Sequence, residues 1–155
     1  MADRFRPYFA VLESLIHSTW SDSSATLYFP VSGWQYFRDE VLKENLSYPI
    51  TFVARGKAQD YRRALTGDAL LLPVQIFRIR QREMTSVEIT ATYNTPEDVL
   101  SEDMEKLRQA LMASASLNIP KRPTFDVSGS NPANMILAGI RDELYAGMLE
   151  VFLEC

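Results

Sequence analysis

The stretch from Leu70 to Asn94 constrains the fold of this chain more than any other. It reads LLLPVQIFRIRQREMTSVEITATYN, two runs rich in β-forming residues that are joined by a short charged segment. Apolar and polar side chains alternate in both runs, which is the pattern of a strand with one buried face. The sequence therefore predicts a long antiparallel hairpin at the centre of the molecule.

One register of this hairpin separates apolar from charged side chains. It places Phe77 opposite Ile89 and Ile79 opposite Val87. A slip of one residue would bury arginine guanidinium groups without partners, at a cost of several kcal/mol each. We therefore predict the first register.

The other face of the predicted hairpin is charged. Arg78 faces Glu88 there, and a loop of about three residues leaves Arg80 and Arg82 at the tip. An exposed basic tip can reach a neighbouring subunit, which makes both arginines candidate interaction residues. A solvated turn is the alternative interpretation.

Two longer helices are predicted from apolar residues spaced three or four positions apart. The first runs from Pro7 to about Trp20, with Pro7 in its first turn. The second begins with Thr95 and Pro96, a cap followed by proline at the first helical position. We expect this second helix, near residues 96–113, to cover the apolar face of the hairpin.

Shorter elements are predicted in the remainder of the chain. An edge strand, a short helix and a further strand precede the hairpin, and an irregular proline-rich stretch follows the second helix. Two more β-rich runs predict a hairpin that closes the fold. In chain order these shorter elements are Ala25–Ser32, Trp34–Leu42, Tyr48–Arg55, Met135–Ile140 and Leu144–Leu153.

Together the elements predict a single α+β domain that spans residues 1–155. Its antiparallel β-sheet is built on the long central hairpin and is packed by the N-terminal helix and by the helix near 96–113. The C-terminal hairpin closes it. The length of the chain is that of one domain.

Composition argues against several classes of protein. A net charge of −4 and a pI near 5.0 disfavour a protein that binds nucleic acid by neutralising phosphates. No apolar run is long enough to span a membrane, and the single cysteine, Cys155, excludes an intrachain disulfide. The opening residues lack the pattern of a signal peptide, so we expect the chain in the cytoplasm of the cell that makes it.

The sequence contains no motif for phosphate binding, zinc binding or acyl transfer. Because the chain has only one histidine, His17, a histidine relay or a metal cluster is nearly excluded. The carboxylates of the helix near 96–113 are accounted for by the helix dipole and by pairing with lysine. We therefore expect no catalytic residue, no cofactor and no metal, and we expect that the protein is not an enzyme.

Two further groups are candidate interaction residues. Trp34 and Phe37 lie on one short helix, where they belong either to the core or to a docking surface for another chain. Tyr61, Arg62 and Arg63 lie in the loop before the hairpin, where basic side chains can meet an acidic surface of a partner. A solvated loop is the alternative.

The order of elements resembles that of the tail terminator and tail-completion (head–tail joining) proteins of tailed bacteriophages. It runs from the amphipathic N-terminal helix through the strand YPITFVAR, the long hairpin and its covering helix to the closing LYAGMLEVFLEC. The resemblance spans most of the chain and rests on element order and size.

This resemblance implies a non-catalytic virion protein that assembles in the host cytoplasm. In that family the subunits form hexameric rings at the head-proximal end of the tail, stop polymerisation of the tail tube and join it to the neck. The implied partners are copies of the chain itself and tail tube, sheath or neck/connector proteins, with neither sequence-specific nucleic acid nor a membrane. A ring needs two complementary surfaces on each subunit, and an acidic lumen repels the DNA that passes through it.

Two alternatives stay open. Residues 34–47 and 120–132 are larger insertions than a minimal terminator needs, which suits a neck adaptor or a baseplate or sheath-associated subunit. From another class, the chain is a small hydrolase or transferase with an unrecognised active site.

Overall fold

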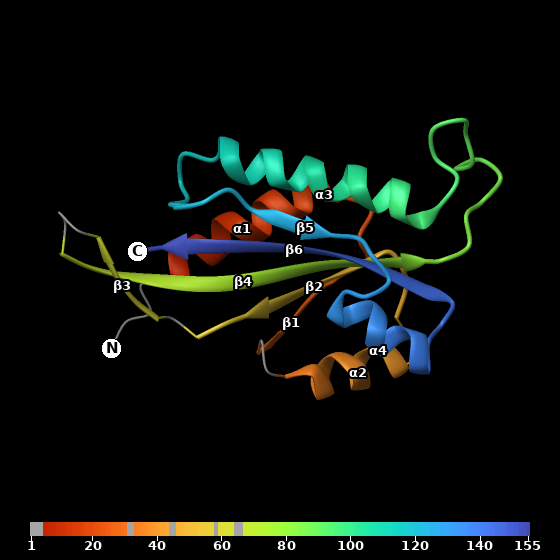
Figure 1. The fold of residues 1–155 in the computed structure, drawn as a ribbon, viewed down its shortest axis with the longest axis horizontal. Coiled ribbons are helices and arrows are strands. Elements are labelled where there is room, and N and C mark those ends of the chain that lie inside the picture. The colour runs from red at the N-terminus through yellow and green to blue at the C-terminus, as the bar shows by residue number, and fades with distance from the viewer. Residues whose placement is uncertain (1–4, 31–32, 44–45, 58, 64–66) are drawn as a thin grey trace.

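A computed structural model describes the chain except for residues 1–4, 31–32, 44–45, 58 and 64–66, and except for the side chains of 59–63 and 67–69. Four helices and six strands form within the described residues (Figure 1). In chain order they are α1 (Arg6–Thr19), β1 (Thr26–Pro30), α2 (Trp34–Leu42), β2 (Ile50–Arg55), β3 (Gln59–Arg63), β4 (Gly67–Gln81), α3 (Pro96–Ala113), β5 (Thr124–Asp126), α4 (Pro132–Ile140) and β6 (Leu144–Glu154).

The strands form one mixed sheet in the order β1-β2-β4-β6-β5, and β3 pairs with the first part of β4. Strands β1 and β2 are parallel, whereas the other neighbours are antiparallel. Helices α1 and α3 cover one face of the sheet, and α2 and α4 cover the other (Figure 1). The α+β class, the N-terminal helix and the helix near 96–113 are thus confirmed.

Strand β4 contributes to both hydrophobic cores. Leu72, Val74 and Ile76 pack under α1 and α3, whereas Phe77 and Ile79 pack under α2 and α4. A strand that is buried on both faces reads as a nearly continuous apolar run. This explains why its sequence dominates the chain.

The predicted pairing of the central hairpin is wrong. Residues 82–94 form turns and loop, and Val87 and Ile89 are 89% and 51% exposed. Phe77 lies opposite Phe52 of β2 and Met148 of β6 instead of Ile89. The reason is that β2 and β6 occupy both edges of β4, so the second β-rich run has no free edge to join.

The closing hairpin needs a correction in its first half. Residues Met135–Ile140 are helical and belong to α4, where Asn131 caps the first turn and Pro132 occupies a first-turn position. Strand β6 forms as predicted, but its antiparallel partners are β4 along its whole length and β5 at its middle, Met148 to Glu150.

The start of α3 confirms the predicted cap. The Thr95 hydroxyl accepts a hydrogen bond from the backbone N–H of Asp98 at 3.3 Å, and the Asp98 carboxylate accepts one from the N–H of Thr95 at 3.1 Å. This reciprocal capping box fixes where the chain leaves the 82–94 loop and enters the helix. Among the described residues, no helix has the length and apolarity needed to cross a membrane.

A buried asparagine joins α4 to β6. The amide of Asn134, 3% exposed, donates to the carbonyl of Ala146 at 2.8 Å and accepts from its N–H at 2.7 Å. The Asn134 side chain thus binds the backbone of Ala146 as a neighbouring strand would, because the pairing of β5 with β6 ends at Met148. Asn131 adds a second bond to the same carbonyl.

We predict that Asn134→Ala lowers the free energy of unfolding by about 1–3 kcal/mol, because the N–H of Ala146 loses its buried acceptor. Urea unfolding followed by circular dichroism measures the change. The control is Met135→Ala, whose side chain is 67% exposed, and whose substitution should change stability by less than about 0.5 kcal/mol. Equal effects of the two variants would contradict the role given to Asn134.

Candidate interaction surfaces

An ion pair holds the 82–94 loop against the end of the sheet. The Arg80 guanidinium donates to both carboxylate oxygens of Glu88, at 2.8 and 2.9 Å. Arg80 is 12% exposed at its side chain, so the pair is partly shielded from water. The hydrogen bond from Arg80 lowers the pKa of Glu88 from its ordinary 4.5 to about 2, with a smaller contribution from the backbone of Thr85.

Hydrogen bonds within the loop give it a defined shape. The N–H of Thr85 donates to the Glu88 carboxylate at 3.0 Å, and the N–H groups of Glu88 and Ile89 donate to the carbonyl of Thr85 at 3.0 and 3.2 Å. The side chains of Val87 and Ile89 therefore stand out from an ordered turn. The loop lies beyond the end of β4 in Figure 1.

The predicted basic tip is only partly present. Arg80 is committed to Glu88 beside the sheet and does not lie at a tip. Arg82 is exposed, and its guanidinium lies 5.4 Å from the ring centre of Tyr145. Val87, an apolar side chain of the same loop, is 89% exposed.

Arg78 is buried and bound on several sides. Its guanidinium donates to Asp103 at 2.9 Å, to both carboxylate oxygens of Asp22 at 2.8 Å and to the hydroxyl of Ser23 at 3.0 Å. It also lies 5.3 Å from the ring centre of Trp20. The predicted pair Arg78–Glu88 is therefore wrong, because the carboxylates that face Arg78 come from the turn after α1 and from α3.

A polar cleft of about 370 Å³ surrounds this arginine. Burial raises the pKa of Asp103, and the charge of Arg78 opposes that shift. The Tyr48 hydroxyl is buried in the cleft wall and has no hydrogen-bond partner. Because the charged groups bind one another, the cluster works chemically as an anchor between the sheet, the end of α1 and the middle of α3.

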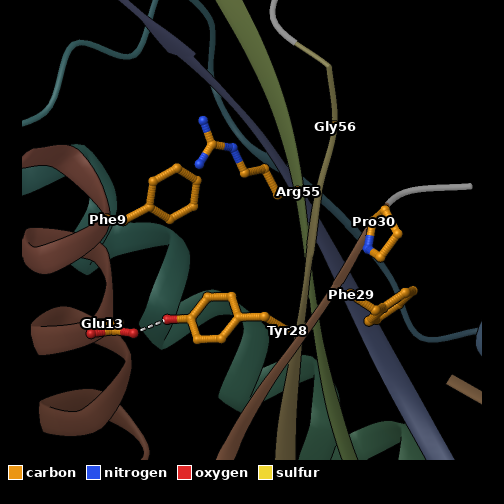
Figure 2. A pocket seen from close by; sticks show the side chains of 7 residues that line it. All are labelled: Phe9, Glu13, Tyr28, Phe29, Pro30, Arg55 and Gly56. Atoms are coloured by element: carbon orange, nitrogen blue, oxygen red, sulfur yellow. Dashed lines mark hydrogen bonds between the residues drawn. The ribbon is translucent and has the colours of Figure 1, made fainter. Parts of the chain in front are cut away.

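A second cavity, which we call the α1–β1 pocket, lies between the first helix and the edge strand (Figure 2). Its volume is about 590 Å³. Figure 2 shows the Tyr28 ring directed toward α1, where its hydroxyl donates to the Glu13 carboxylate. The residues that line the pocket are Phe9, Glu13, Tyr28, Phe29, Pro30, Arg55 and Gly56.

Two contacts hold the walls of the α1–β1 pocket in place. The Arg55 guanidinium lies 4.7 Å from the ring centre of Phe9. Burial, and then the bond to Glu13, raise the pKa of Tyr28, so its hydroxyl stays protonated as a donor. The ring of Tyr28 is nonetheless 46% exposed. The pocket is thus a braced, largely apolar hollow that is open to solvent.

The two aromatic candidates of α2 have different positions. Phe37 is fully buried, with its ring 5.1 Å from that of Phe52, and it is a core residue that cannot dock another chain. Trp34 is partly buried and lines a groove of about 440 Å³ between α2 and α4. The neighbouring Met135 is 67% exposed. Trp34 therefore remains a candidate contact residue.

Tyr61, Arg62 and Arg63 were predicted to lie in a loop, but their backbone forms β3 and pairs with β4. Their side chains lie outside the described residues. Within the described part of the chain, no group of three or more histidine, cysteine, aspartate or glutamate side chains is placed to hold a metal ion.

The sequence pattern did not indicate that Val87 and Ile89 are exposed, and it did not indicate the α1–β1 pocket. The first two were assigned to the buried face of a strand because their alternation matches one. The pocket joins Phe9, Tyr28 and Arg55 from three separate elements, and no local pattern signals such a meeting. The sequence matches no protein-family model, and no curated protein is detectably related to it.

We predict that Glu88→Gln lowers stability at pH 6 by about 1 kcal/mol, the upper range for a partly exposed ion pair. Because the pKa of Glu88 is about 2 in the folded chain and 4.5 ordinarily, this stabilisation is present above pH 4.5 and is lost as the pH falls toward 2. The difference between the variant and the parent protein should therefore shrink over that interval in urea unfolding. Glu83→Gln, on the same loop, is the control and should differ little at either pH.

Proposed function

We propose that this chain is a non-catalytic structural subunit of a tailed-bacteriophage virion, of the tail terminator or head–tail joining type. It acts as a ring of identical subunits, with a hexamer as the expected form, at the head-proximal end of the tail. Its partners are other copies of itself and tail tube, sheath or neck proteins. The chain is assembled into the virion in the host cytoplasm.

One observation carries this proposal: the chain exposes two unlike apolar surfaces that lie at separate positions along its sheet. The 82–94 loop lies beyond the end of β4 (Figure 1), and its Val87 and Ile89 are 89% and 51% exposed. The α1–β1 pocket lies near the middle of β4, where β2 finishes at Arg55 beside Val74. Closed rings are made by contacts between two different, mutually complementary surfaces, and apolar patches on an ordered surface mark sites of association.

The described charges support an assembly role more than a catalytic one. Arg78 and Arg80 bind carboxylates within the chain, so the polar cleft between them acts as structural support. A net charge of −4 suits a subunit that surrounds DNA without binding it.

A neck adaptor or a baseplate or sheath-associated subunit is the second candidate. The groove between α2 and α4 favours it, because this groove, lined by apolar side chains together with Gln35 and Arg38, is a third surface that lies on the opposite face of the sheet from α1 and α3. Met135, which lines this groove, is 67% exposed. A ring that joins two different structures needs such an additional surface for the second one.

We predict that the purified protein elutes as a discrete oligomer near six times its chain mass of 17.7 kDa. Size-exclusion chromatography with multi-angle light scattering measures this mass, and negative-stain electron microscopy tests for a central channel. A single discrete mass with annular particles supports the ring. A monomer across the concentration range from 1 to 200 µM, chosen as roughly the span for protein interfaces of ordinary affinity, would overturn the proposed function.

A further inference from the structure

We infer that the open edge of β1 pairs with the β1 edge of a second copy, so that the two sheets join antiparallel across a two-fold axis. The inference goes beyond the proposed function, because it concerns one contact between two copies and holds whether or not a ring forms. In a ring, other surfaces make the remaining contacts.

The outer edge of β1 carries backbone groups that point away from the sheet. Strand β1 is an end strand and pairs only with β2. The N–H of Thr51 donates to the carbonyl of Ala25 at 3.1 Å, and alternate residues of a strand bond the same neighbour. Leu27 therefore faces β2 as Ala25 does, whereas Thr26 and Tyr28 present their N–H and C=O groups outward.

These outward groups lack partners within the described part of the chain. No hydrogen bond there reaches the backbone N–H or C=O of Thr26 or Tyr28. Such an edge is a template for another strand, and natural edges are often blocked by charged side chains. Strand β1 reads TLYFP and carries no charge. Only Pro30, which has no N–H, limits how far a pairing can extend.

The edge is complementary to itself. When a second β1 runs antiparallel with its Leu27 facing Leu27 of the first copy, each Thr26 lies opposite Tyr28 of the other copy. Opposite residues whose backbone groups face each other exchange both of their hydrogen bonds. Every outward N–H and C=O of these two residues therefore finds a partner.

The other end strand, β5, cannot replace β1 as the partner. Leu70 and Cys155 exchange backbone hydrogen bonds, and counting along the antiparallel pair of β4 and β6 from there shows that the even-numbered residues of β6 face β5. Thr124 and Asp126 lie opposite such residues and bond β6, so Phe125 alone faces outward. One outward residue leaves half of the β1 edge unpaired.

The side chains suit the symmetric pairing as well. Thr26 and the second copy's Tyr28 lie on the α1 face, and a β-branched residue opposite an aromatic one stabilises a strand pair. Tyr28 is 46% exposed in the single chain and gains cover. On the other face Leu27, which already packs against the core under α2 and α4, meets its own copy. Since β1 is uncharged, no like charges oppose one another within the pair.

Disulfide formation tests the register. Leu27 and its copy form a non-hydrogen-bonded pair, whose Cα atoms lie about 4.5 Å apart, within the range of about 4.4–6.8 Å that a disulfide spans. Leu27→Cys is made together with Cys155→Ser, so that no other thiol is present. Mild oxidation should then give a covalent dimer on a non-reducing gel.

The matched control is Thr26→Cys in the same Cys155→Ser background. Thr26 and its copy are diagonal neighbours, roughly 7–8 Å apart, so this variant should link little. Circular dichroism should show that both variants are folded. Equal linking of the two variants, or no linking of Leu27→Cys, would overturn the pairing.

A proline tests the backbone hydrogen bonds. Thr26→Pro removes one outward N–H from each copy and no bond to β2, and proline is tolerated as the first residue of an edge strand. The concentration at which half of the chains are associated, measured by light scattering, should rise about tenfold or more. The matched control is Thr26→Val, which keeps the N–H and should leave that concentration nearly unchanged. Equal values for the two variants speak against the pairing.

The outcomes separate this inference from the proposed function. If the parent protein is monomeric, both fail, and a second copy is not what covers the β1 edge. If the parent protein forms a ring in which Leu27→Cys does not link, only the pairing of β1 is rejected. If it forms a dimer that links through Leu27→Cys and no ring, the pairing stands and the ring is rejected.

Discussion

Strand β4 has both edges occupied from Val74 to Ile79, by β2 on one side and β6 on the other, and the rest of the structure depends on this constraint. A central strand with two partners leaves no edge for the β-rich run that follows it. That run turns away from the sheet before α3 begins. The side chains that would have been buried in a hairpin, Val87 and Ile89, stay on the surface instead.

Two arginines of β4 determine how the chain leaves the sheet. Arg78 binds Asp22 and Asp103 and thereby ties the end of α1 and the middle of α3 to the strand. Arg80, on the same face, binds Glu88 and holds the displaced run as an ordered turn. Removing one partner of a shielded pair leaves a poorly hydrated charge, so these contacts specify the geometry even where their net contribution to stability is small. The result is a rigid loop with an apolar end.

Local patterns in the sequence predict most of the elements, because they depend on neighbours along the chain. The cap at Thr95, the helical spacing of α1 and the edge strand with Pro30 are of this kind. The errors arise where distant segments compete for the same partner, because the outcome of that competition decides which structure forms. Residues 85–91 do not pair with β4, because β6 already occupies that edge of the strand. Met135–Ile140 is helical because Asn131 and Pro132 start a helix there, and Asn134 binds β6. Phe37 is buried by a strand and a helix whose positions cannot be predicted from the spacing of apolar residues in the sequence. The α1–β1 pocket forms only because α1 packs beside β1.

The central claim is that copies of this chain associate and that the open edge of β1 is a surface through which they do so. Hydrogen–deuterium exchange of the backbone, compared between dilute and assembled protein, tests it most directly, because amides that become hydrogen-bonded in an interface exchange more slowly. The account predicts that the amides of Thr26 and Tyr28 become protected on assembly, with little change at Leu27, whose amide already faces β2. Amides of Thr26 and Tyr28 that exchange equally fast in both states would contradict it.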